Sequence, residues 1–270
     1  MVVLCPAKIN LFLAVGPREP SGYHPIRTIF QAVGLFDRLT VERTHGETTV
    51  ESDSPSVPKE NTVTHTLRLL NECLALPPLK IRLEKRIPVQ SGLGGGSSDA
   101  AGLLRAIQAM HLGQVPETEW HAVAAAVGAD VPFFLTGGRA QGEHYGDRIT
   151  PLEDHAKQWV TILKPRAGCS TAEAYANLDA QTRPWREFPS EPNGFNDFEG
   201  VAPQECQALL SEVRKQSPRL ACLAGSGSAI VAIWDSCEQA QSCSDGISPV
   251  FDGERFVVPT LSRAESLQID

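Results

Sequence analysis

Residues 88–101 read Pro-Val-Gln-Ser-Gly-Leu-Gly-Gly-Gly-Ser-Ser-Asp-Ala-Ala, a glycine-dense stretch that decides the fold. It passes directly into a segment whose apolar residues, from Leu103 to Met110, have helical spacing. Small residues leave backbone N–H groups free to point at a ligand, and a helix N-terminus adds the positive end of its dipole. The stretch therefore predicts a phosphate-binding loop that begins a helix.

Two alternatives to phosphate binding are a flexible turn and glycines that allow a helix to pack closely. The loop is no Walker loop, because no Lys-Ser/Thr follows at the required spacing, and it lacks the G-x-G-x-x-G register. Three consecutive glycines, Gly94 to Gly96, run into two serines at the predicted helix start. That combination favours phosphate binding over both alternatives.

The segments around the loop predict mixed strands and helices. Before it, alternating apolar residues predict strands at residues 9–15, 29–34, 39–43, 48–51 and 79–83, with a helix from Thr62. After it, we expect helices at 117–127, from Ser170 and from Gln204. We also expect a strand from Trp159 and one over 221–234 that residues 225–228, Gly-Ser-Gly-Ser, interrupt. Since no strict βαβ rhythm is present, the fold class is α+β. We expect two domains, residues 1–155 and 156–270.

Composition narrows the function classes. The chain has 270 residues, 41% of them hydrophobic, and a net charge of −8 without a dense Lys/Arg run, which argues against nucleic-acid binding. No apolar run approaches the roughly 20 residues of a membrane helix, and no signal peptide is evident. Seven cysteines without a CxxC pair favour reduced thiols over disulfides or zinc. We expect a cytoplasmic protein with neither nucleic acid nor membrane as a partner.

Five polar or aromatic residues outside the loop are candidates for chemistry. Lys8 and Asn10 fall on one face of the first strand, because strand side chains alternate. Asp130 stands between a predicted helix end and an apolar run, and Tyr23 with His24 lies in a turn. Each has a structural alternative: Lys8 extends to the surface, Asp130 caps a helix or turn, and the aromatics are ordinary loop residues. Seven scattered histidines, with no H-x-x-x-H, suggest no metal site.

Three segments, in this order along the chain, resemble the motifs of the GHMP kinase superfamily: residues 6–11, 88–101 and 223–229. Within the superfamily the chain is most similar to the 4-diphosphocytidyl-2-C-methyl-D-erythritol kinase family. That similarity is carried by residues 7–13, 22–24 with Thr28 and Gln31 following, 94–100, 128–132 and 196–199.

The resemblance implies a catalytic N-terminal domain and a smaller C-terminal α/β-sandwich domain, with the active site in the cleft between them. It also implies ATP with Mg²⁺ as cofactors and phosphorylation of the C2 hydroxyl of a cytidine-diphosphate-linked methylerythritol. That reaction belongs to the methylerythritol phosphate (non-mevalonate) pathway of isoprenoid biosynthesis. The implied partners are small-molecule substrates, and the chain is expected to be a monomer or weak homodimer.

Residue roles follow from the same resemblance. Asp130 is the general base and Lys8 its cationic neighbour. Asn10 binds the methylerythritol part, Tyr23 and Tyr175 sandwich the cytosine, and His24 reads the edge of that base. The implied ATP-binding residues are Pro88, Gly92, Leu93, Gly94, Gly95, Gly96, Ser97, Ser98, Asn61 and Lys85.

Some features depart from the family or leave alternatives open. Pro25 follows His24, the third motif begins Ala-Gly-Ser, and no metal ligand is assigned, with Asp99 and the serine hydroxyls of the loop as candidates. Another GHMP kinase, of the homoserine or mevalonate type, is one alternative, against which the Gly-Tyr-His turn argues. A catalytically silent nucleotide-binding relative is the other, against which the presence of both Lys8 and Asp130 argues.

Overall fold

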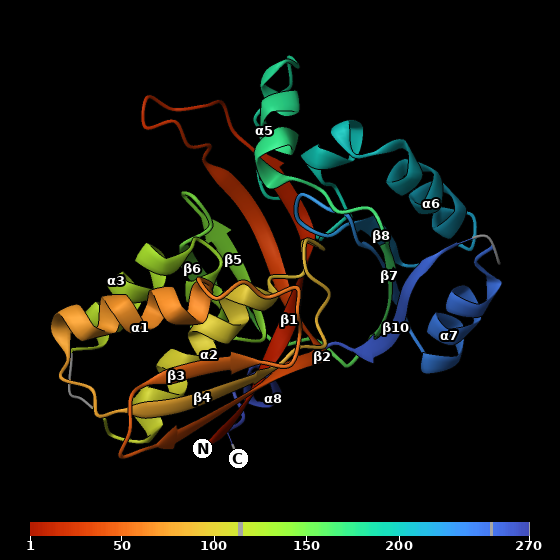
Figure 1. The fold of residues 1–270 in the computed structure, drawn as a ribbon. Helices are drawn as coiled ribbons and strands as arrows, with labels where there is room; N and C mark the ends of the chain where they lie inside the picture. The colour runs from red at the N-terminus through yellow and green to blue at the C-terminus, as the bar shows by residue number, and fades with distance from the viewer. Residues whose placement is uncertain (113–115, 249–250, 270) are drawn as a thin grey trace.

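Two sheets lie face to face between two layers of helices (Figure 1). The computed structural model describes residues 1–112, 116–248 and 251–269. The first sheet has six strands in the order β3-β4-β2-β5-β6, with β1 paired to β2. The second has four strands in the order β10-β7-β9-β8. This arrangement is the predicted α+β fold.

A long antiparallel hairpin, β1 (Val2–Val15) with β2 (Ile26–Arg43), forms the centre of the molecule. The other strands of the first sheet are β3 (Thr49–Ser52), β4 (Leu79–Glu84), β5 (Arg139–Glu143) and β6 (Arg148–Pro151). We predicted separate strands at 29–34 and 39–43. This prediction was wrong, because both segments belong to the single strand β2. Asp37, in the expected gap, is fully buried because Lys85 neutralises it.

Four helices cover the outer face of the first sheet: α1 (Thr62–Cys73), α2 (Gly95–Ala109), α3 (Glu117–Val127) and α4 (Val131–Thr136). Their buried side chains form one core with that face, in which Phe30 and Leu103 are among the largest. Helix α2 packs between α1 and β1, so its N-terminus, and with it the glycine loop, is held in a fixed place.

The second sheet consists of β7 (Trp159–Pro165), β8 (Leu220–Leu223), β9 (Ile230–Trp234) and β10 (Gly253–Pro259). Its outer face is covered by α5 (Thr171–Asp179), the 3₁₀ helix η1 (Asp197–Val201), α6 (Gln204–Arg214) and α7 (Cys237–Gly246). The strand predicted over 221–234 consists of two strands, and the interruption expected at residues 225–228 is part of the turn between them. Strands β5, β6 and β10 were not predicted, because they gain their stability from pairing with strands that are distant in the sequence or weakly patterned themselves.

A continuous apolar layer joins the two sheets. Ile9 and Ile29 from the hairpin pack with Ile162 and Val231 from the second sheet. Because β1 and β2 are covered on both faces, they lack the polar alternation of a half-exposed sheet. This layer fixes the second sheet against the first and leaves the cleft at its edge.

The end of the chain returns to the first sheet, so the two termini lie together (Figure 1). Ile269 forms a bridge with Val3, and helix α8 (Arg263–Ser266) packs on β1 and β2. The predicted domain division at residue 155 stays a prediction.

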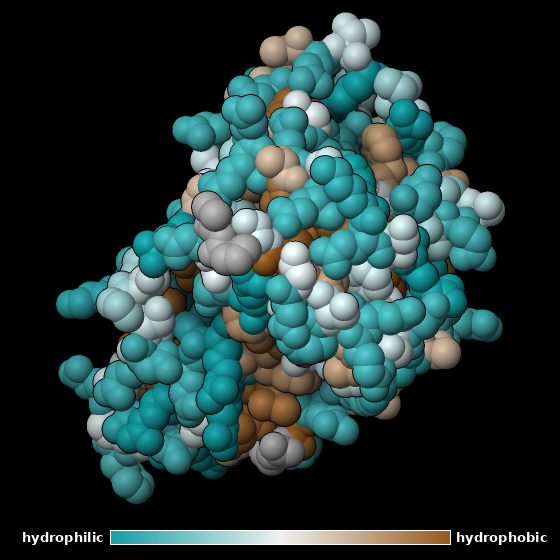
Figure 2. Space-filling model, turned by 90° about the vertical axis from the view of Figure 1, so that its right-hand side faces the viewer, coloured by the Kyte–Doolittle hydropathy of each residue, from teal (hydrophilic) through white to brown (hydrophobic). Residues whose placement is uncertain are grey.

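The surface facing the viewer in Figure 2 is mainly hydrophilic, with apolar side chains in narrow recesses.

All seven cysteines are free thiols. Within the described ranges, none of the helices is both long and apolar enough to cross a membrane.

Candidate active site

A cavity of about 1000 Å³ brings most of the sequence-predicted site residues together. It lies where the hairpin, the glycine loop, the start of α4 and helix α5 meet. The predicted residues that line it are Lys8, Asn10, Tyr23, His24, Gly92, Gly94, Ser97, Asp130 and Tyr175. The other predicted residues lie outside this lining: Pro88, Leu93, Gly95, Gly96, Ser98, Asn61 and Lys85.

Lys8 and Asp130 form an ion pair in the wall of the cavity. The Lys8 Nζ atom lies 3.2 Å from Asp130 Oδ2, and the exposed fractions of the two side chains are 4% and 29%. Lys8 therefore does not extend to the surface. Asp130 occupies the N-cap position of α4 but makes no capping hydrogen bond with its side chain. Both structural alternatives for these residues are thus contradicted, and a carboxylate is left accessible beside a buried cation.

A hydrogen-bond chain orients Lys8. Its Nζ donates to Asn10 Oδ1 at 2.9 Å, and the same oxygen accepts from the backbone N–H of Gly225 at 3.1 Å. Asn10 Nδ2 donates to Thr28 Oγ1 at 2.7 Å, and that hydroxyl donates to the Phe12 carbonyl at 2.8 Å. The hydrogen bond between Asn10 and Gly225 links the first sequence motif to the third. One amide hydrogen of Asn10 has no partner among the described residues.

The glycine loop approaches its neighbours too closely for a larger residue at two positions. Gly94 has φ +75° at the N-cap of α2, and a Cβ there would lie 2.9 Å from Phe134 Cζ and 3.0 Å from Lys8 Cγ. Gly92 has φ +78°, and a Cβ there would overlap the Ala224 carbonyl oxygen. These glycines do serve close packing, and the same packing places the N-terminus of α2 at the cavity beside Lys8.

Lys85 is held in a buried cluster behind the loop. Its Nζ contacts Asp37 Oδ2 and lies 2.7 Å from Asp99 Oδ2. Asp37 Oδ1 also accepts from the backbone N–H groups of Arg86 and Ile87. Burial, reinforced by the charge of Asp37, raises the pKa of Asp99 to about 8. Lys85 occupies Asp99 Oδ2, and Asp99 is buried and does not line the cavity, so it is a poor candidate for a Mg²⁺ ligand.

Asn61 and the residues around it support the loop from the side of α1. The Asn61 side chain caps α1 by accepting from the N–H groups of Val63 and Thr64. Thr62 Oγ1 donates to the Gly96 carbonyl at 2.7 Å, which joins the starts of α1 and α2. Ser98 is fully buried, and its hydroxyl has no partner among the described residues.

The aromatic residues at the cavity mouth form two pairs. Tyr23 is 65% exposed, and its ring centroid lies 5.2 Å from that of Tyr145. His24 stacks on Tyr175 at 4.8 Å, and its Nε2 lies 2.6 Å from Asp179 Oδ1. The structure thus pairs Tyr23 and Tyr175 with different rings, and His24 already covers one face of Tyr175.

Sequence reasoning did not identify Tyr145, Asp147 or Asp179 as cavity residues. Tyr145 and Asp147 lie in the turn between β5 and β6, two strands that carry little apolar signal. Burial acts to raise the pKa of Asp147, but hydrogen bonds from His144 and backbone N–H groups outweigh it and lower the pKa. The hydrogen bond from His24 lowers the pKa of Asp179.

Tyr175 lies close enough to Asp130 for the charge of that carboxylate to act on its phenol. Burial raises the pKa of its phenol to about 12, and the negative charge of Asp130 adds to this effect. The phenol therefore stays protonated at neutral pH. Among the described residues, no group of three or more His, Cys, Asp or Glu side chains could hold a metal ion.

Comparison with known proteins agrees with this geometry. Residues 61–138 match the family profile of the GHMP kinases N terminal domain. The 4-diphosphocytidyl-2-C-methyl-D-erythritol kinase of Polaromonas naphthalenivorans is 36% identical over 257 residues, which cover 87% of this chain and 86% of the relative. The enzyme of the same name from Ralstonia nicotianae is also 36% identical, over 92% of this chain and 90% of the relative.

Solved structures give the same result. A crystal structure of 4-(cytidine 5'-diphospho)-2C-methyl-D-erythritol kinase has a TM-score of 0.81 and 30% identity, covering 96% of this chain and 99% of that one. A homoserine kinase from Cytophaga hutchinsonii has a TM-score of 0.73 at 18% identity, covering 97% of this chain and 94% of that one, which shows a shared fold alone. With a third of its residues identical over nearly its full length, the chain belongs to the 4-diphosphocytidyl-2-C-methyl-D-erythritol kinase family of GHMP kinases.

Proposed function

We propose that this protein transfers the terminal phosphoryl group of ATP to the C2 hydroxyl of 4-diphosphocytidyl-2-C-methyl-D-erythritol, a step toward isoprenoids. The observation that carries the proposal is the 3.2 Å pair between Lys8 Nζ and Asp130 Oδ2, in a cavity shared with the glycine loop. A silent nucleotide-binding relative has no need of an accessible carboxylate held beside a buried cation. The names of the relatives above support the choice of alcohol.

The pair supplies acid–base and electrostatic catalysis. Asp130 accepts the proton of the substrate hydroxyl as its oxygen attacks the γ-phosphorus, and the bond from that phosphorus to the bridging oxygen of ADP breaks in line. Lys8 keeps the carboxylate ionised and offsets the charge on the attacking oxygen. Asn10 holds the ammonium in place through its Oδ1 and presents its remaining N–H to the polyol.

The glycine loop binds the phosphates of ATP. Gly92, Gly94 and Ser97 line the cavity, and the N-terminus of α2 places its positive dipole end there. Lys85 and Asn61 act indirectly: Lys85 holds the loop through Asp99, and Asn61 caps the start of α1. Hydroxyl oxygens such as that of Ser97 would be candidates to hold Mg²⁺, which would neutralise phosphate charge when bound with ATP.

The cytosine binds at the aromatic end of the cavity. Tyr23 offers an exposed ring, with Tyr145 beside it. His24 reads the base edge, oriented by its hydrogen bond to Asp179 and by stacking on Tyr175. In this arrangement Tyr175 supports His24, whereas a direct sandwich with Tyr23 requires His24 to move aside.

ADP release measured with a panel of alcohols tests the proposal. We expect Mg²⁺-dependent turnover with the cytidylylated methylerythritol and little with homoserine or mevalonate. Equal turnover with either of the other alcohols would contradict the substrate. Binding of ATP without turnover of any alcohol would instead indicate the silent relative.

A further inference from the structure

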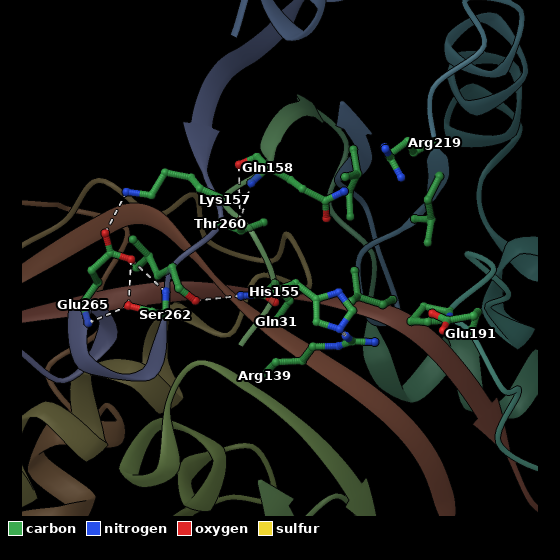
Figure 3. A pocket seen from close by; sticks show the side chains of 15 residues that line it. Gln31, Arg139, His155, Lys157, Gln158, Glu191, Arg219, Thr260, Ser262 and Glu265 are labelled. Atoms are coloured by element: carbon green, nitrogen blue, oxygen red, sulfur yellow. Dashed lines mark hydrogen bonds and ion pairs between the residues drawn. The ribbon is translucent and has the colours of Figure 1, made fainter. Parts of the chain in front are cut away.

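A second cavity, of about 670 Å³, lies between the two sheets and shares no lining residue with the catalytic cavity (Figure 3). Its walls come from β1, β2 and β5 of the first sheet and from β8 and β9 of the second. The segments at residues 155–158, 191–192 and 260–265 complete it. Leu11, the last residue of the first motif, and Gln31 belong to its lining, but the glycine loop, Asp130 and the third motif do not. The proposed phosphoryl transfer therefore leaves this cavity unexplained.

A buried arginine faces this cavity without a counter-ion. Arg139 is 7% exposed, and its Nη1 contacts His155 Nε2, so the imidazole accepts the hydrogen bond. In the described ranges no carboxylate lies within ion-pair distance of this guanidinium, and its Nε and Nη2 have no hydrogen-bond partner. Figure 3 shows the guanidinium directly beneath the His155 ring. A buried charge of this kind is costly unless an opposite charge accompanies it.

The other cations of the cavity already have partners. Lys157 Nζ lies 2.7 Å from Glu265 Oε1, and Arg219 pairs with Asp235. Burial lowers the pKa of Arg139, and the charge of Glu191, an exposed residue of the lining, only partly opposes this effect. Glu191 makes no ion pair with Arg139 or another described residue. An anion entering the cavity would therefore meet one uncompensated cation.

The rest of the lining is partly apolar. Leu11, Leu220, Ile233 and Leu261 contribute to it, from both sheets and the returning C-terminal segment. Gln31 braces that segment by donating to the Leu261 carbonyl at 2.9 Å. A ligand matched to these walls has an anionic head and an apolar body.

We propose that this cavity binds a small amphiphilic oxyanion, a carboxylate or phosphate carried on an apolar group, with Arg139 as its counter-ion. A guanidinium presents a planar fork of donors that suits either anion. The apolar body then lies between the two sheets, against Leu220 and Leu261. The site is separate from the phosphoryl-transfer site.

The test uses the whole protein with sodium benzoate and phenyl phosphate as probes, and benzyl alcohol as the neutral control, at constant ionic strength. Calorimetry gives the dissociation constants, and thermal melts give the stabilisation. We expect either or both anions to bind and to raise the melting temperature, while the alcohol does neither. Binding of one anion alone identifies the head group, and binding of both indicates a general oxyanion site.

Three variants assign the binding to the cavity. Arg139→Met should weaken anion binding at least about tenfold, because a charge-assisted hydrogen bond is lost. Glu191→Gln should tighten it, because a nearby negative charge is removed. Arg105→Met is the matched control: Arg105 is equally buried, but it donates to the Leu4 and Ser266 carbonyls and lies outside the cavity, so anion binding should persist.

Several results would overturn the proposal. One is the absence of anion binding to the wild type. Another is anion binding that persists in Arg139→Met, because the probe would then bind elsewhere, for example at the phosphate loop. If Arg139→Met does not fold, the Glu191→Gln variant decides, and unchanged or weaker anion binding there contradicts the site. Because the readouts are affinity and melting temperature, these outcomes do not depend on the kinase activity.

Discussion

Lys8 Nζ lies 3.2 Å from Asp130 Oδ2, although one residue belongs to the first strand and the other precedes the fourth helix. The lysine backbone N–H donates to the Leu93 carbonyl of the glycine loop at 2.9 Å. Strand β1 therefore holds Lys8 between the glycine loop and Asp130. A substitution in the glycine loop, at Lys8 or at Asp130 should therefore affect the position of the other two.

Replacing Asp130 with asparagine removes the base but keeps its shape. We expect kcat to fall roughly 10²–10⁴-fold with modest changes in either KM. The melting temperature should change little, since the Asp130 side chain makes no capping hydrogen bond. Asp245→Asn, at an exposed position on α7, is the control and should keep full activity. Steady-state kinetics and melts on the same samples check this, and a full kcat in Asp130→Asn would remove its catalytic role.

Lys8→Met tests whether the pair acts as a unit. Its kcat should also fall strongly, because the cation stabilises charge that develops in the transition state. The double variant with Asp130→Asn should be little worse than the poorer single variant. If the fold loss in kcat of the double variant equals the product of the losses in the two single variants, the two residues act independently.

Gly94→Ala should reduce both ATP affinity and stability. The backbone at φ +75° disfavours a Cβ, and that atom would press against Phe134 and Lys8. We expect about 1 kcal/mol or more of stability to be lost. Gly96→Ala should cost less, since its nearest contact, Thr62 Oγ1, is 3.3 Å away. Urea unfolding and nucleotide titration measure the two effects, and equal losses in both variants would contradict this explanation.

Tyr23→Ala should affect the alcohol substrate alone. Loss of a stacking face worth roughly 1–3 kcal/mol should raise the KM for the cytidylylated substrate about 5- to 150-fold. The KM for ATP and the melting temperature should stay the same, because the ring is 65% exposed. A change confined to the KM for ATP would show that Tyr23 lines the nucleotide site instead.

The buried cluster behind the loop should make stability depend on pH. Since burial and Asp37 raise the pKa of Asp99 to about 8, the folded state holds a proton that the unfolded state releases near pH 4. Stability should therefore decrease as pH rises from about 4 to about 8. Asp99→Asn should flatten that dependence. Urea unfolding at several pH values checks this, and identical slopes in the variant and the wild type would exclude Asp99 as the cause.

The local sequence was sufficient to predict the elements that depend only on neighbouring residues. The glycine loop and the helix after it follow from backbone and dipole physics, and Lys8 and Asn10 share a strand face because strand side chains alternate. The hydrogen bond between those two side chains confirms their placement on one face. Resemblance to a family then connected Asp130 to Lys8, a relation that spacing alone does not contain.

Only the tertiary structure decided what depends on partners distant in the chain. Asp37 reads as a break between two strands, yet it is buried within one strand because Lys85, from the segment after β4, neutralises it. Tyr145 reaches the cavity on a hairpin that forms by pairing with β2. Arg139 faces a second cavity because two sheets and the returning C-terminus enclose it. Sequence determines which residues can carry charge, stack or turn, whereas packing determines which of them are buried together, and burial sets the strength of their interactions.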